Sequence, residues 1–427
     1  MDSKTEIIEP WHFWKLISFR FILIYFFLRS SLWAFIPVVG MYLYKFYYFP
    51  SLFLQNYILK WNDPYRWEHP PSGSGDTLDD WMLGVAYLLL SFILTLIWSL
   101  IDRRRKEHDI LHNYFTVVLR YYLAMIMFSY GISKLFVNQM LYPSLAQFYT
   151  PLGEFTPMRF TWMYLGYSAP YQFFGGLMET LGGLLILFRR TQLLGLLVLL
   201  GVMGNVFLLN LFYGVPVKLF SFFLILIILY LLFQYRQPLI NLLFNRPTSP
   251  VIVPNQFKTG WKRYLRITLK VAFIGYYFCY AFYQDYQYSS ELKDVPPLQI
   301  EGAWDVERFT KNQEEITSPT DTTRWNRIVI SKRFSAGRGR GHITCGTSNF
   351  KPVNFELDST MQLSVTPKYQ DEYQLFSGSV VQKNEDQFFW KGTSGNDTLE
   401  IWLRRNQHEF TLDKRKFMWV METKDFY

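Results

Sequence analysis

The sequence predicts an all-α membrane bundle followed by an all-β domain. Apolar segments fill about the first two-thirds of the 427 residues, and the remainder alternates short β-branched and aromatic runs with turn residues. Charge divides the chain at the same place. Residues 296–427 hold 18 basic and 18 acidic side chains, so residues 1–295 carry the whole net charge of +9. A basic excess within a hydrophobic region is typical of multi-pass membrane proteins and argues against nucleic-acid binding.

Seven segments are predicted to span the membrane. The first span lies near 30–48, after an interfacial amphipathic stretch that begins at Leu16. The six others are 81–101, 113–137, 172–188, 192–213, 219–235 and 267–282. Basic residues gather in the loops on one side, at 103–106, 189–190 and 236–266, which predicts a cytoplasmic N-terminus. Seven crossings then place the C-terminal domain in the periplasm of a bacterium, with the helices in its inner (cytoplasmic) membrane.

Polar side chains inside these spans mark the candidate site. Glu179 lies in the middle of its span, where a carboxylate costs several kcal/mol unless it is paired, protonated or hydrated. From the helical rise, Asn205 lies at a similar depth, Lys134 lies nearer the outer end and Arg120 nearer the inner face. Asn210 lies on another face of the helix that carries Asn205.

Glycines accompany these polar positions at spacings of three and four residues, and small residues let helices approach closely in lipid. They are Gly131, Gly175, Gly176, Gly182, Gly183, Gly201 and Gly204. One interpretation is a structural seam of ion pairs and hydrogen bonds that fixes helix register. Another is the polar floor of an apolar pocket that opens outward and binds an amphiphile such as a quinone or a lipid. Ion or proton transfer is a third.

The same residues carry a family resemblance. Arg120, the run Gly131-Ile-Ser-Lys134 and the run Gly176-Leu-Met-Glu179-Thr-Leu-Gly-Gly-Leu-Leu resemble the DoxX-like membrane proteins, over about residues 112–236. That family has a four-helix core with an Arg early and a Gly-x-x-Lys late in its first helix, and an acid before a Gly-Gly-Leu-Leu run in its second. The resemblance implies quinone-linked or thiol-redox roles, since some relatives are subunits of quinone-linked thiosulfate oxidation. The additional helices and the β domain depart from the minimal family pattern.

With this core, the chain divides into four parts. Residues 1–111 form an N-terminal interfacial segment with two transmembrane helices, and 112–236 form the DoxX-like core. Residues 237–295 form a cytoplasmic connection with the seventh transmembrane helix, and 296–427 form the extracytoplasmic β domain.

The β domain is predicted to be an up-and-down barrel or a sandwich of about eight strands. After an opening strand at Trp304, strands are expected at 324–331, 342–346, 361–366, 373–381, 387–392, 398–404 and 417–422. Gly302-x-Trp304 with the late Arg404 is similar to the lipocalin-like pattern, in which a Trp of the first strand packs against a late Arg. Such a barrel either encloses one apolar ligand or is filled by its own side chains.

Cysteines and histidines limit the chemistry. Cys279 and Cys345 are far apart in the sequence, the six histidines are scattered, and no metal site is predicted. Electrons would therefore need a quinone, the one candidate cofactor, or a partner subunit. We predict a protein that binds a quinone or lipid within the membrane as a subunit of a cell-envelope complex. The alternatives are a scaffolding subunit whose β domain binds partner proteins, and a quinone-coupled oxidoreductase.

Overall fold

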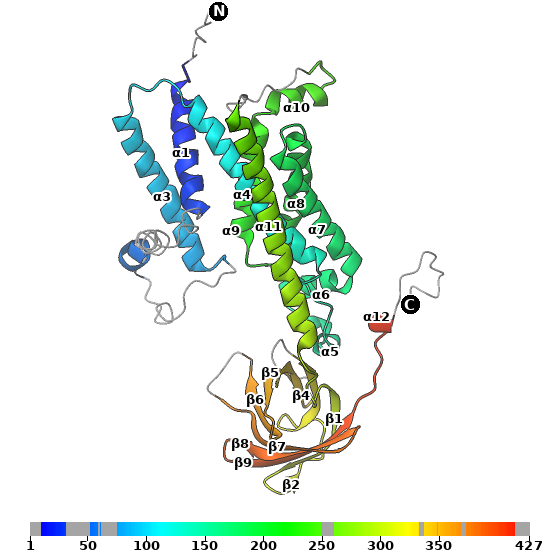
Figure 1. Cartoon of the computed structure of the whole chain (residues 1–427). Helices are drawn as coiled ribbons and strands as arrows, with labels where there is room; N and C mark the ends of the chain where they lie inside the picture. Colours follow the sequence, from blue (N-terminus) through cyan, green and yellow to red (C-terminus); the bar gives the residue numbers. More distant parts are fainter. Residues whose placement is uncertain are drawn as a thin grey trace, which may run out of the picture. The chain divides into compact units, whose positions relative to one another are not determined.

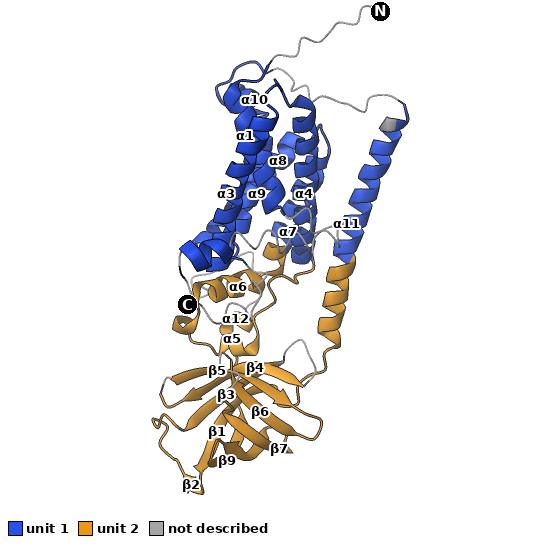
Figure 2. Cartoon of the chain, turned by 90° about the vertical axis from the view of Figure 1, so that its left-hand side faces the viewer, with its two compact units in different colours: residues 1–135, 173–282 blue, residues 136–172, 283–427 orange. Residues whose placement is uncertain are grey.

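The computed structural model describes residues 10–30, 52–58, 60, 75–248, 260–332, 337–347, 349–368 and 373–414. They belong to two compact units, shown in different colours in Figure 2. Unit 1 contains Met1–Leu135 and Phe173–Phe282, and unit 2 contains Phe136–Gln172 and Tyr283–Tyr427. The segment 136–172, which the sequence-based division places in the helical core, therefore groups with the β domain.

Unit 1 is helical (Figure 1). Its elements are α1 (Phe13–Arg29), the short π-helix η2 (Leu54–Ile58), α3 (Leu78–Ile101), α4 (Asp109–Leu135), most of α7 (Ala169–Leu187), α8 (Gln192–Phe212), α9 (Lys218–Phe233), α10 (Arg236–Leu243) and most of α11 (Trp261–Asp294). Leu123, Leu199 and Ile227 are fully buried between these helices. Thr77 is the N-cap of α3, because its hydroxyl accepts from the Asp80 amide and the Asp80 carboxylate accepts from the Thr77 amide.

Several of these helices could cross a membrane. Among the described residues, four are long and apolar enough: Leu78–Ile101, Asp109–Leu135, Gln192–Phe212 and Arg263–Asp294. α9 and α10 would add a fifth as one broken span, bent by 80°. The predicted span 172–188 corresponds to the 19-residue helix α7, which is not among the helices that are long and apolar enough to cross a membrane. The predicted span 30–48 lies, beyond Ser30, outside the described residues.

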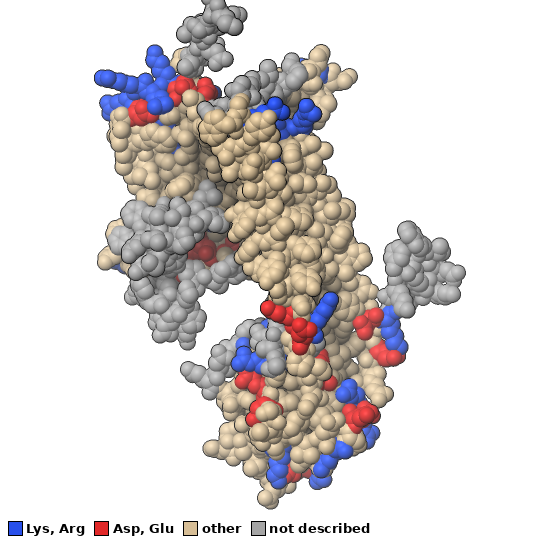
Figure 3. Space-filling model, viewed as in Figure 1, with Lys and Arg blue, Asp and Glu red and all other residues tan. Residues whose placement is uncertain are grey.

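The surface of unit 1 has the charge distribution of a membrane-embedded bundle. In the face that Figure 3 shows, few Lys, Arg, Asp or Glu lie along the lengths of the helices, and groups of Lys and Arg, with some Asp and Glu, lie at one end of unit 1. The exposed loop Arg103-Arg-Arg-Lys106 between α3 and α4 belongs to that end. Large apolar side chains such as Phe92 and Ile93 of α3 are about half exposed, which suits contact with lipid tails.

Unit 2 contains a closed antiparallel β-barrel. Its strands are β1 (Gly302–Lys311), β2 (Glu314–Glu315), β3 (Trp325–Lys332), β4 (Arg338–Cys345), β5 (Asn349–Leu357), β6 (Gln362–Pro367), β7 (Phe376–Asn384), β8 (Gln387–Ser394) and β9 (Asp397–Arg405). Neighbours in sequence pair from β3 to β9, and β1 pairs with both β3 and β9 to close the barrel. The two-residue β2 pairs only with β1 among the described strands. The barrel alternative is therefore confirmed over the sandwich.

The short β2 and the longer β5 were not predicted, and one predicted strand is untested. β5 contains Pro352 and two asparagines, which oppose a strand assignment. The sequence feature that indicates this strand is the alternation of the apolar, buried Val353 and Phe355 with the more polar Asn354 and Glu356. The strand predicted at 417–422 lies outside the described residues.

The barrel interior is filled by its own side chains, in line with the second of the two alternatives above. Trp304, Phe355, Phe388 and Trp390 are fully buried in one apolar core. The predicted Trp–Arg contact is formed by a different arginine: the Arg405 guanidinium lies 4.7 Å from the Trp304 ring centroid. Antiparallel register places Arg405, and not Arg404, opposite Trp304.

Three helices, α5 (Leu145–Phe148), the 3₁₀ turn η4 (Leu152–Glu154) and α6 (Pro157–Tyr167), also belong to unit 2, as does α12 (Thr411–Lys414). The Ala146 amide donates to the Ser331 hydroxyl of β3 at 2.9 Å, and the Tyr149 hydroxyl donates to Asn406 at 2.9 Å. The segment 136–172 thus packs against the barrel.

We expect the barrel to lose stability in acid because of His342. This side chain is 2% exposed and packs on Phe350, and burial lowers its pKa from 6.5 to about 4, with Arg327 and Arg159 adding to the effect. The unfolded chain takes up a proton near pH 6.5 and the folded chain only near pH 4. The free energy of unfolding should therefore fall by about 3 kcal/mol as the pH decreases through this window, and level off below it. Hydrogen exchange of barrel amides in the detergent-solubilised full chain measures this, and His342→Gln should remove that slope.

Candidate functional site

Lys134 and Glu179 form a buried ion pair in unit 1. Lys134 lies in the last turn of α4 and Glu179 in the middle of α7. The Lys134 ammonium donates to Glu179 Oε1 at 2.8 Å and to Oε2 at 2.6 Å. The two residues are 9% and 2% exposed. The charges thus neutralise each other where neither is well hydrated, which is the arrangement a low-dielectric setting requires.

Glycines bring the two helices together at this pair. A Cβ built on Gly176 would lie 2.5 Å from the Gly131 carbonyl oxygen and 2.7 Å from Lys134 Cβ. A Cβ on Gly183 would lie 2.9 Å from Met127 Cβ. Only glycine permits such an approach of α7 to α4, so the predicted glycine seam exists at these positions.

The fifth predicted span does not join the pair. Asn205 is exposed on α8, and no described residue lies within 4 Å of a Cβ built on Gly201 or Gly204. The helical rise gives the height of a residue along its axis, but the rotation of the helix about that axis follows from packing. Lys134 is the hydrogen-bond partner of Glu179 among the described residues, and a role for Asn205 in the site stays a prediction.

Arg120 also lies apart from the pair, with a partner that the sequence reasoning missed. Its Nη1 donates to Gln192 Oε1 at 2.6 Å, at the start of α8. Arg120 is 7% exposed, and its Nε has no hydrogen-bond partner among the described residues. Gln192 lies at the start of α8, after the basic turn Arg189-Arg190. In the sequence, a polar residue at the start of a helix indicates capping and does not indicate a partner for a buried arginine.

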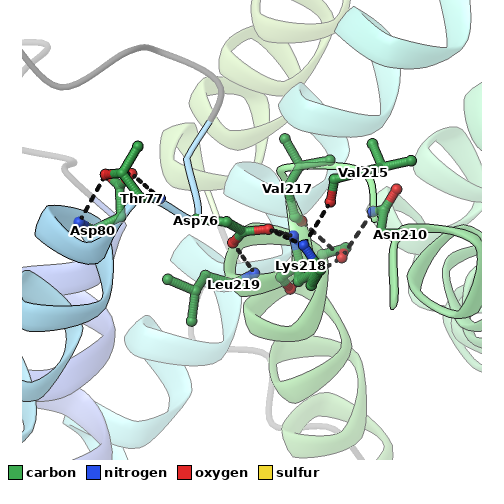
Figure 4. A network of polar contacts seen from close by, with 9 residues as sticks. Asp76, Thr77, Asp80, Asn210, Val215, Val217, Lys218 and Leu219 are labelled. Carbon is green, nitrogen blue, oxygen red and sulfur yellow. Dashed lines mark hydrogen bonds and ion pairs between the residues drawn. The ribbon is translucent and has the colours of Figure 1, made fainter. Parts of the chain in front are cut away.

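Asn210 belongs to a polar network between α8 and α9 (Figure 4). Its amide donates to the Ser221 hydroxyl at 3.0 Å. Asp76 caps α9, because its carboxylate accepts from the backbone amides of Lys218 at 2.5 Å and Leu219 at 2.9 Å. A carboxylate at a helix N-terminus satisfies unpaired amides and complements the helix dipole. This network joins the start of α3 to the α8–α9 turn, which is a structural role.

The surroundings of the ion pair differ between its two members. Among the described residues, a Cβ built on Gly175 would meet only Lys134 Cδ, at 3.9 Å. The Lys134 side chain is 11% exposed, against 3% for Glu179. Tyr130, which is 38% exposed, has its ring centroid 5.7 Å from the ammonium nitrogen. Lys134 is therefore the more exposed partner of the pair, with Tyr130 and Gly175 among its described neighbours.

The chain is 28% identical over 137 residues to the uncharacterized protein YwoB of Bacillus subtilis (strain 168), a match that covers 30% of this chain and 81% of that protein. No family model and no solved structure matches the chain. The DoxX-like resemblance therefore stays a prediction.

Proposed function

We propose that unit 1 is a membrane-embedded binding protein for an amphiphile, a quinone or a lipid, whose polar head meets Lys134 beside Glu179. The observation that carries this proposal is the partial exposure of the Lys134 side chain, which is 11% exposed against 3% for Glu179. A lysine has three N–H donors, and among the described residues Lys134 uses two of them, both on Glu179. The third is suited to an acceptor oxygen of the ligand, such as a quinone carbonyl or a lipid ester or phosphate oxygen.

The surroundings support a ligand with an apolar body. The Tyr130 ring offers an aromatic face next to the ammonium, and the neighbouring surface of α7 is apolar, with Phe174 58% exposed. Glu179 holds Lys134 in place and neutralises it when no ligand is bound. By the DoxX-like resemblance, this would be the inner-membrane subunit of a cell-envelope complex, with a cytoplasmic N-terminus and a periplasmic barrel.

A scaffolding role is the second candidate, and the close packing at Gly131, Gly176 and Gly183 favours it. In that case the ion pair would only fix the register of α4 against α7. The two candidates differ in what happens when the space beside Lys134 is filled without disturbing the helices.

Gly175→Leu is expected to expel a co-purifying quinone or lipid while the protein remains folded. The new Cβ meets only Lys134 Cδ at an ordinary contact distance, and the longer side chain occupies the approach to the ammonium. Mass spectrometry of organic extracts, per mole of purified protein, gives the occupancy. Gly201→Leu is the matched control, since it adds the same side chain where nothing lies nearby. Equal occupancy in the two folded variants and the wild type would favour the scaffold.

A further inference from the structure

Unit 2 contains a cavity of about 710 Å³ on the outer wall of the barrel. Strands β3, β4 and β5 form one wall, through Ser331, His342 and Phe350 among others. Ile343 and Cys345, the alternate residues of β4, belong to the barrel core, so His342 faces outward. The segment 136–172 and the last turns of α11 form the remaining walls. The cavity is thus separate from the filled barrel interior and from the Lys134–Glu179 pair.

Basic side chains, and no acidic ones, are among the described residues that line the cavity. Of its lining residues that the structure describes, Arg159, Arg340 and Lys368 are basic, and none is Asp or Glu. His342 stays neutral above a pKa of about 4, so it contributes hydrogen-bonding capacity and no charge near neutral pH. The Arg159 charge acts on His342 across this space, since it is one of the two cations that lower the pKa of His342. A site with this balance attracts an anion.

The rest of the lining is apolar or aromatic, which a small inorganic anion would not use. Leu141, Trp162, Leu292, Val295 and Phe350 lie around the cavity. Its volume is within the range of small-molecule pockets, roughly 300–1,000 Å³. The Gln139 Oε1 atom is buried there without a hydrogen-bond partner among the described residues, and it can accept from a ligand hydroxyl.

We propose that this cavity binds an anionic amphiphile, a single acyl chain with a carboxylate or phosphate head, and that Arg159 is the residue that contacts the head. The acyl chain would lie against Trp162 and Phe350. This site is independent of the proposed function of unit 1, and it gives the barrel-bearing unit a ligand of its own.

Brominated palmitate and lysophosphatidate are suitable probes, titrated into the full-length protein in a neutral maltoside detergent. Bromine quenches nearby tryptophan fluorescence, so quenching that disappears in Trp162→Phe reports occupancy of this cavity. Arg159→Gln should weaken binding of the acidic probe by about tenfold, which corresponds to the loss of one charge-assisted hydrogen bond. Arg159→Lys should recover part of this loss.

Arg338→Gln is the matched control, because Arg338 lies two residues from Arg340 on the same strand, is exposed and pairs with Glu356 outside the cavity lining. The affinity of Arg338→Gln for the acidic probe should stay within about twofold of that of the wild type. Hexadecanol lacks the charge, so it should bind Arg159→Gln and the wild type with equal affinity. Equal loss in Arg159→Gln and Arg338→Gln, or displacement of the acyl probe by inorganic phosphate at the same concentration, would overturn the proposal. Glu179→Gln should leave this binding unchanged, which separates the test from that of unit 1.

Discussion

Lys134→Met is expected to destabilise the protein by about 3–5 kcal/mol, because it leaves the Glu179 carboxylate buried without its counter-charge. Glu179 is 2% exposed, and Lys134 is its one hydrogen-bond partner among the described residues. Methionine keeps most of the length of the lysine side chain, so the loss reports the charge and its hydrogen bonds. Thermal unfolding of the purified protein in detergent measures the effect.

Glu179→Gln is the companion variant and should be much milder for folding. The amide still accepts a hydrogen bond from Lys134, and the remaining ammonium has partial access to its surroundings. If the ligand head depends on the pair, the folded Gln variant should nevertheless lose its co-purifying quinone or lipid. Equal melting temperatures for Lys134→Met and the wild type would show that the buried pair does not contribute to stability. A Gln variant with full ligand occupancy would leave the pair a structural role.

Gly176→Leu is expected to prevent the close packing of α4 and α7, at a cost of about 3 kcal/mol or more. Even the first carbon of the new side chain would lie 2.5 Å from the Gly131 carbonyl oxygen, and a backbone atom cannot move aside as a flexible side chain can. The yield of monodisperse protein and its melting temperature should both fall. Gly176→Ala should already show part of the effect.

Gly201→Leu is the control for this experiment too. Gly201 also lies in an apolar helix, but no atom of a described residue lies within 4 Å of its built Cβ, so the variant should melt like the wild type. Similar melting of Gly176→Leu and Gly201→Leu would contradict the observed α4–α7 packing.

The coarse organisation of this protein follows from residue order alone. Long apolar runs have to be helices in lipid, because lipid cannot satisfy backbone polar groups, and short alternating runs with turn residues predict an antiparallel sheet. The sequence also offers Lys134 as a partner for Glu179, because a carboxylate inside an apolar helix is costly unless it is paired, and a lysine nearer the outer end of its span has a side chain long enough to reach inward. The glycines at 131, 176 and 183 indicate where two helices approach.

Only the tertiary structure decided which side chains meet. Gly176 and Gly175 are adjacent and chemically identical, yet a Cβ on Gly176 would collide with the Gly131 backbone, whereas a Cβ on Gly175 would meet Lys134 Cδ at an ordinary contact distance. Asn205 is exposed on its helix, and the arginine over Trp304 is one position from the predicted residue. The cationic cavity joins 136–172 to strands more than a hundred residues later. Rotation, register and long-range docking depend on the sum of many small packing energies, which local sequence patterns do not contain.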